Sequence, residues 1–162
     1  MKVARSIVAI LVGVMATLAI TPMTAGGDVC WNYKRRDRAM TRKINRTRAN
    51  RDRVKLQLDP HLSKVARRHT KSMADANVLN HTKALGKKVT RWRSLGENVG
   101  YGFSVKNLHN MFMDSSAHRE NILKRKFRYI GVGTVKSGGW VWTTVVFESR
   151  RNPGTTLSMP SC

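Results

Sequence analysis

Hydrophobic positions follow a helical period near the start of the chain and then change to alternation. Within residues 35–51, Met40, Ile44 and Thr47 recur on one helical face, and arginines fill the other faces. Residues 54–58 then alternate between apolar and polar side chains. The pattern predicts a helix followed by an extended connector.

A second helix is predicted to begin at Asp59-Pro60 and to run to about Ala76. An aspartate before the first turn accepts hydrogen bonds from unpaired backbone amides, and proline suits the first helical position. His69 falls on the apolar face, so we expect it to be a core histidine. The complete predicted apolar face is Leu62, Val65, Ala66, His69, Met73 and Ala74.

The next segment, residues 83–102, is punctuated by glycines and is predicted to be irregular. Ser104 is expected to cap a third helix, and Ser115-Ser116 interrupts it before a short helical turn over residues 118–123. The side chains predicted to face inward from the third helix are Val105, Leu108, Met111 and Phe112.

The period becomes two in residues 129–135 and 140–148, which predicts two strands joined by Ser137-Gly138-Gly139. Both faces of the second strand are apolar, so the sheet should be covered on both sides. The predicted fold class is α+β, an α-β-α sandwich with a small central antiparallel sheet between helix layers. The tryptophans Trp92, Trp140 and Trp142 are expected in the core or a cavity wall.

The first residues have the three parts of a secretory signal peptide. Lys2 and Arg5 precede an apolar run over residues 7–20, and small residues follow as far as Gly26. The apolar run is shorter than the roughly 20 residues that a membrane-spanning helix needs. We expect cleavage after Gly26 and a secreted chain, released or retained at the cell surface, with an uncleaved N-terminal anchor as the alternative.

If the chain is exported, its two cysteines, Cys30 and Cys162, are in an oxidising compartment. In an oxidising compartment an even pair is read as a disulfide. A Cys30–Cys162 bridge would tie the ends of the mature chain together. Free thiols or pairing between molecules are the alternatives.

The chain of 162 residues is strongly basic, with 31 Lys and Arg against 9 Asp and Glu and a formal net charge of +22. A hydrophobic content of 41% is sufficient for a core and excludes a disordered polycation. Basic residues concentrate in 34–55, 83–93 and 119–128. Such a surface favours polyanions such as cell-wall polymers or lipid head groups. Nucleic acid is less favoured, because most aromatic residues follow the core pattern of strands; solubility alone is the alternative.

Three segments taken together resemble a known family. They are LSKVARRHTKSMADANVLNH at residues 62–81, GENVGYG at 96–102 and FMDSSAHRENIL at 112–123. In this order and spacing they are similar to the CAP superfamily of cysteine-rich secretory proteins, venom antigens and pathogenesis-related proteins, and most closely to its bacterial SCP-like members. The resemblance implies the same α-β-α sandwich. It divides the chain into a signal peptide (1–26), a basic segment (27–38), a CAP/SCP-like domain (39–150) and a tail with Cys162 (151–162).

The resemblance also implies a cavity with His81, Glu97 and His118 in it. Ser115 stands near the position where eukaryotic members have a second glutamate, and Phe112 replaces their usual tryptophan. Two imidazoles and a carboxylate with an open position suit Zn²⁺ or another divalent metal. Without metal, Glu97 would hold a histidine protonated, or the three residues would form a structural hydrogen-bonded cluster.

The expected function is that of a secreted binding module. Its His/Glu cavity would take a divalent metal or a small ligand, and its basic surface would bind anionic polymers. A metal-dependent hydrolase using the same cavity is one alternative, and a cationic wall- or nucleic-acid-binding protein with a purely structural cavity is another. No catalytic residue is assigned, because a set of metal ligands is not by itself an active site.

Overall fold

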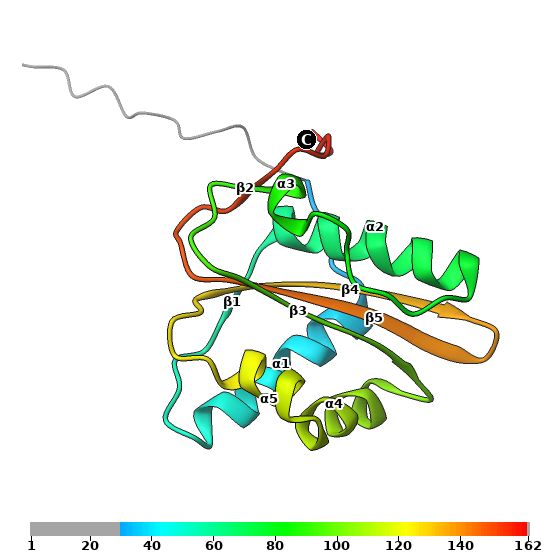
Figure 1. Cartoon of the computed structure of the whole chain (residues 1–162), viewed down its shortest axis with the longest axis horizontal. Coiled ribbons are helices and arrows are strands. Elements are labelled where there is room, and N and C mark those ends of the chain that lie inside the picture. Colours follow the sequence, from blue (N-terminus) through cyan, green and yellow to red (C-terminus); the bar gives the residue numbers. More distant parts are fainter. Residues whose placement is uncertain (1–29, 162) are drawn as a thin grey trace, which may run out of the picture.

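The computed structural model describes residues 30–161. A four-stranded sheet lies between α2 on one face and α1, α4 and α5 on the other (Figure 1). This layering confirms the predicted α+β sandwich. The elements in chain order are α1 (Arg35–Ala49), β1 (Gln57–Leu58), α2 (Pro60–Ala76), α3 (Leu85–Lys88), β2 (Val89–Thr90), β3 (Leu95–Gly102), α4 (Val105–Asp114), α5 (Ser116–Leu123), β4 (Tyr129–Ser137), β5 (Trp140–Glu148) and β6 (Gly154–Thr155).

The strand order in the sheet is β1-β4-β5-β3, so β3 is an edge strand. Strands β3, β5 and β4 pair antiparallel, whereas the short β1 pairs parallel with β4. The predicted connector thus supplies a parallel edge strand to the sheet. The Asn45 side chain holds its start, because it donates to the Leu56 carbonyl at 2.9 Å and accepts from the Leu56 amide at 2.8 Å.

The helix starts agree with the local sequence signals. The Asp59 carboxylate accepts from the Leu62 amide at 2.9 Å, and Pro60 occupies the first position of α2. The Ser104 hydroxyl accepts from the Asn107 amide at 3.1 Å and caps α4. Both predicted caps are confirmed.

Helix α2 lies unusually close to the sheet. A Cβ atom added at Gly131 would overlap the backbone of Leu62, and one added at Gly133 would overlap the backbone of Arg67. Only glycine allows this approach of two backbones. The opposite face packs through larger side chains, including Met40, Phe112, Phe127 and Phe147.

The prediction of an irregular segment over residues 83–102 is wrong. This segment contains α3, β2 and the eight-residue β3, which pairs with β5 along its whole length. Glycines disfavour strands, but here they meet a tertiary requirement. A Cβ at Gly100 would lie 3.1 Å from the Phe112 ring, and one at Gly102 would overlap the Asn107 side-chain oxygen.

Three side chains differ from their predicted environments. His69 is only partly buried and its Nε2 lies 2.8 Å from the Asn80 carbonyl oxygen, whereas the neighbouring Thr70 is fully buried. Met111 is 48% exposed and Trp92 is 45% exposed, so neither belongs to the core. The other five predicted positions of the α2 face are buried, and Thr70, four residues after Ala66 and four before Ala74, takes the place predicted for His69.

Arg48 is fully buried although it belongs to an arginine-rich helix. Its guanidinium donates to the carbonyls of Val54 at 2.8 Å and Ile122 at 2.7 Å, and more weakly to those of Lys124 and Phe127. Burial, followed by the charges of Arg128 and Arg53, lowers the pKa of Arg48 to about 10. Arg48 therefore ties α1 to the end of α5 as a cation.

Both flanks of the predicted domain contribute to the fold. Asp37, in the segment predicted as basic and N-terminal, is fully buried and forms a 2.7 Å ion pair with Arg67 and accepts from the Thr134 hydroxyl at 2.6 Å. In the predicted tail, β6 pairs antiparallel with β2.

Residues 1–26, predicted to be a signal peptide, lie outside the described residues, and so does Cys162. The cleavage after Gly26 and the Cys30–Cys162 disulfide therefore stay predictions. Within residues 30–161, no helix combines the length and apolar character needed to cross a membrane.

Candidate functional site

Glu97 on β3 is the centre of a compact hydrogen-bonded group. Its Oε2 atom accepts from the Thr82 amide at 2.9 Å and from His81 Nδ1 at 2.8 Å, and its Oε1 atom accepts from the Thr82 hydroxyl at 2.5 Å. The Glu97 side chain is 6% exposed, whereas that of His81 is 64% exposed. Because an ionised carboxylate only accepts hydrogen bonds, Nδ1 of His81 carries the proton and Nε2 is left toward solvent.

The main chain of His118 is held from the other face of the same edge strand. Side chains alternate along β3, so Glu97 points to the α2 face and the buried Asn98 points to the α5 face. Asn98 donates to the His118 carbonyl at 3.0 Å. Asn121 of α5 donates to the Asn98 side-chain oxygen at 3.0 Å and to the Glu97 carbonyl at 3.2 Å. These amides fix α5 against β3.

The imidazole of His118 is held neutral. Its ring packs against Phe112 with centroids 4.9 Å apart. Burial, with a smaller contribution from the nearby charge of His81, lowers the pKa of His118. At neutral pH the ring therefore offers one donor and one acceptor. Ser115, which precedes α5, accepts from the His118 amide through its hydroxyl at 3.5 Å.

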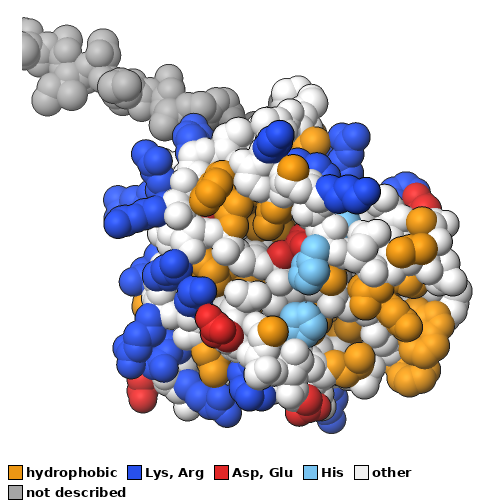
Figure 2. Space-filling view, viewed as in Figure 1, with side chains coloured by type: hydrophobic (Ala, Val, Ile, Leu, Met, Phe, Trp, Pro, Cys, Tyr) orange, Lys and Arg blue, Asp and Glu red, His pale blue; other side chains and the backbone are white. Residues whose placement is uncertain are grey.

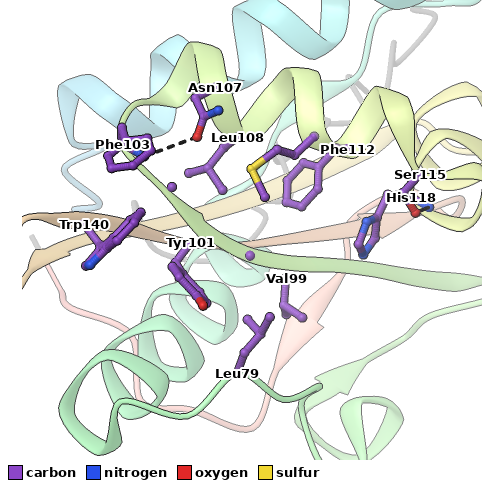
Figure 3. A pocket seen from close by; sticks show the side chains of 13 residues that line it. Leu79, Val99, Tyr101, Phe103, Asn107, Leu108, Phe112, Ser115, His118 and Trp140 are labelled. Carbon is purple, nitrogen blue, oxygen red and sulfur yellow. Dashed lines mark hydrogen bonds between the residues drawn. The ribbon is translucent and has the colours of Figure 1, made fainter.

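A cavity of about 500 Å³ opens between β3 and α4. Figure 3 shows His118 and Ser115 at one end of it and Tyr101, Phe103 and Trp140 at the other. The lining is largely apolar, and Asn107 adds a polar group. The lining residues are Leu79, Val99, Gly100, Tyr101, Gly102, Phe103, Asn107, Leu108, Met111, Phe112, Ser115, His118 and Trp140.

The far end of the cavity carries exposed aromatic rings. Phe103 is 74% exposed, and its ring centroid lies 4.5 Å from that of Trp140. Tyr101 stacks on Trp142 at 4.7 Å. In Figure 2 hydrophobic side chains gather on one side of this face, and histidines lie at its middle. Contiguous exposed apolar side chains of this kind are typical of interaction and ligand-binding sites.

The structure brings the predicted site residues together only in part. His118 and Ser115 line the cavity, whereas His81 and Glu97 lie outside its lining and bond to each other. Sequence reasoning missed Leu79, Tyr101, Phe103 and Asn107. Only Tyr101 lies on β3, where the alternation of the strand would have been its signal and the glycines concealed it; Leu79 and Phe103 lie in connecting segments and Asn107 lies on α4.

As placed, His81, Glu97 and His118 do not fit a three-ligand zinc centre. Both Glu97 oxygens already accept hydrogen bonds from Thr82, and Oε2 also accepts from His81. Across the described part of the chain, no three His, Cys, Asp or Glu side chains form a group that could hold a metal ion. The metal stays a prediction from sequence.

The arrangement can be compared with known proteins. The model of the CAP, or Cysteine-rich secretory protein, family matches residues 41–147. The chain is 35% identical over 100 residues to the protein YkwD of Bacillus subtilis, and the match covers 54% of this chain. It spans little more than a third, 37%, of the length of YkwD.

Solved structures support the same fold. An outer surface protein of Borrelia burgdorferi matches 70% of this chain and 92% of its own, with a TM-score of 0.64 and 19% identity. An extracellular protein of Bacillus anthracis with an SCP domain matches 71% of this chain and 40% of its own, with a TM-score of 0.63 and 22% identity. The venom allergen-like protein 4 of Schistosoma mansoni matches 79% of this chain and 97% of its own, with a TM-score of 0.64 and 10% identity. With the family match over residues 41–147, these similarities place the chain in the CAP family of cysteine-rich secretory proteins, among relatives that include bacterial SCP-domain proteins.

Proposed function

We propose that this protein is a secreted binding protein whose cavity takes a small amphiphilic ligand. The observation that carries this proposal is the uneven lining of the cavity. Its body is apolar and aromatic, whereas His118 and Ser115 form a polar end. A cavity of about 500 Å³ falls within the usual range for small-molecule sites.

The polar end favours a head group that forms hydrogen bonds. The neutral His118 ring offers one donor and one acceptor, and the Ser115 hydroxyl offers both. His81, held by Glu97, adds a second imidazole nearby. A carboxylic acid or an alcohol on an apolar chain fits this set of partners.

The test is a binding titration with a dansyl-labelled fatty acid. Met111→Trp should fill the cavity from α4 and weaken binding at least tenfold, because Met111 lines the cavity and is half exposed. His118→Gln should weaken it by about tenfold, since one hydrogen bond to a charged head group contributes about 1.5 kcal/mol or more. Trp92→Phe, a change at an exposed residue outside the cavity, is the matched control and should bind as the wild type does.

Equal affinity in the wild type and in Met111→Trp would contradict the cavity as the binding site. A second titration of the wild type uses a dansyl amide that lacks the alkyl chain. If both probes bind equally, the apolar body of the cavity does not contribute, and the proposal fails.

The second part of the proposal is a basic surface that holds the secreted protein to anionic polymers. The net charge of +22, of which Lys2 and Arg5 in the predicted signal peptide supply only two, supports it, and basic side chains occupy much of one side of the face in Figure 2. Binding to a synthetic polyanion such as polyacrylate should fall steeply between low and high salt, because exposed charges are screened. Affinity that does not change with salt would contradict it.

The predicted divalent metal and the hydrolase alternative need separate tests. Zinc binding by metal-stripped protein that is lost in the His81→Ala/His118→Ala double variant would support a metal site. Substrate turnover that is lost in His118→Ala but kept after neutralisation of surface arginines would support an enzyme. The geometry favours neither over ligand binding, because Glu97 is committed to Thr82 and His81.

A further inference from the structure

A second concavity lies at the other end of the sheet from the aromatic rings. It encloses about 470 Å³ and is lined by Arg93, Ser94, Lys126, Arg128 and Ser149. These residues come from the segment before β3, the loop between α5 and β4, and the residue after β5. They meet because Leu95 and Tyr129 both pair with Glu148 at the end of β5. We call these five residues the basic pocket.

Buried Glu148 builds two walls of the basic pocket. Its Oε1 atom accepts from the Arg93 amide at 2.9 Å, the Arg150 amide at 2.7 Å and the Ser149 hydroxyl at 3.3 Å. The carboxylate therefore fixes the backbone on both sides of the concavity. Oε2 of Glu148 has no hydrogen-bond partner among the described residues.

The positive charges of the basic pocket are not consumed by ion pairs. Among residues 30–161, the four ion pairs within 4.0 Å involve none of Arg93, Lys126 and Arg128. All three side chains are exposed. Together with the single Glu148 carboxylate they leave an excess of two positive charges at the basic pocket. Three like charges around one concavity repel one another, and a bound anion would relieve this repulsion.

We propose that the basic pocket binds a phosphate group. Two guanidinium groups, one ammonium group and the Ser94 hydroxyl are donors that phosphate oxygens prefer, whereas the Ser149 hydroxyl already donates to Glu148. An excess of two positive charges matches a phosphate that carries nearly two negative charges at neutral pH. The rigid backbone around Glu148 distinguishes this pocket from a diffuse basic surface.

The inference deepens the polyanion-binding part of the proposed function and does not depend on the cavity. Free inorganic phosphate and the phosphate of a lipid head group present the same chemistry. Two probes separate these sources: inorganic phosphate in solution, and phosphatidylcholine vesicles with and without phosphatidic acid.

The test compares two triple variants that remove the same charge from the full mature chain. Arg93→Gln/Lys126→Gln/Arg128→Gln empties the basic pocket of cations. Arg42→Gln/Lys106→Gln/Lys136→Gln removes three exposed cations elsewhere. We expect the pocket variant to bind inorganic phosphate at least tenfold more weakly by calorimetry, and the control to stay within twofold of the wild type.

Similar losses in both variants, or no binding of millimolar phosphate by the wild type, would overturn the proposal. Because Arg128 also donates to the Phe127 carbonyl, the exposed single change Lys126→Gln is made as well, and it should weaken binding without lowering the melting temperature. A parallel loss of binding to phosphatidic acid vesicles would identify a lipid head group, and a loss for free phosphate alone would identify a soluble phosphate.

The outcome is separable from that of the proposed function. If the polyacrylate affinity is salt-dependent but phosphate binding does not change in the pocket variant, the basic surface stands and the pocket fails. If the pocket variant loses phosphate binding and the polyacrylate affinity is insensitive to salt, the basic pocket is supported and the basic surface is contradicted. Fatty acid binding should be unchanged in both triple variants.

Discussion

The two faces of the central sheet are built in different ways. On the α2 face, glycines bring helix and strand into backbone contact, and polar groups pair across the layer, as Thr70 does with Thr144 at 2.9 Å. On the other face, α4 rests on β3 through side chains and leaves a cavity of about 500 Å³. We call the α2 face the closed face and the face covered by α4 the open face. Because the closed face holds the sheet in shape, the open face can contain a binding site without weakening the fold.

The largest effect should come from breaking the close contact on the α2 face. Gly133→Ala places a methyl group within 2.5 Å of backbone atoms of Ala66 and Arg67, which cannot rotate away. We expect a loss of more than about 3 kcal/mol in the free energy of unfolding, at the upper end for overpacking. Urea denaturation measures it. Gly86→Ala is the control, because its methyl meets only the exposed Trp92 side chain, and it should cost less than about 1 kcal/mol.

On the open face, Arg48 ties α1 to the end of α5. Arg48→Met would leave four carbonyl groups without their donor, and we expect a loss of about 2 to 3 kcal/mol. The exposed Arg46→Met should change stability by no more than about 0.5 kcal/mol. If the two variants unfold at the same urea concentration, the open face does not depend on the buried cation.

The group around Glu97 should contribute less. Thr82→Val keeps the shape of the side chain but removes the hydroxyl that donates to Glu97. We expect about 1.5 kcal/mol of destabilisation, because the lost hydrogen bond goes to a charged and nearly buried acceptor. Thr155→Val removes a 3.0 Å hydrogen bond to the neutral Lys88 carbonyl and a 3.1 Å one from the Leu157 amide, and it should cost less because neither partner is charged. The reverse order would contradict a special role for the Glu97 carboxylate.

The smallest effect concerns pH. The pKa of His118 is lowered in the folded protein, so the unfolded chain binds this proton more readily. The stability contributed by neutral His118 is present above about pH 6.5 and is lost as the pH falls toward the lowered pKa. The free energy of unfolding, measured at about pH 7.5 and at about pH 5.5, should therefore fall less for His118→Gln than for the wild type. An equal decline in both proteins would place the effect elsewhere, for example at His109, whose pKa burial also lowers.

Local signals were sufficient for much of the fold. The caps at Asp59 and Ser104 act within one helical turn, and β5 is apolar on both faces, so each can be predicted from a few neighbouring residues. Strand β3 could not be predicted in this way. Its glycines are explained by Phe112 and Asn107, which lie on another element.

The candidate site could likewise be predicted only in part from the sequence. The resemblance to the family pointed to His81, Glu97, Ser115 and His118, but it did not show that Glu97 is bonded to His81 and Thr82 whereas His118 and Ser115 line the cavity. The burial of Arg48 was equally hidden, because a sequence rich in arginine does not show which guanidinium finds four carbonyl groups.

The amide pair Asn98 and Asn121 has a consequence for how such a site can evolve. Both amides hold main-chain carbonyls, those of His118 and Glu97, and every residue type supplies a carbonyl. Positions 97 and 118 are therefore fixed in space whatever side chains they carry. Substitutions at positions 97 and 118 can therefore change the side chains at the edge strand while the main chain keeps its place. New ligand specificity can evolve at this site without a change of fold.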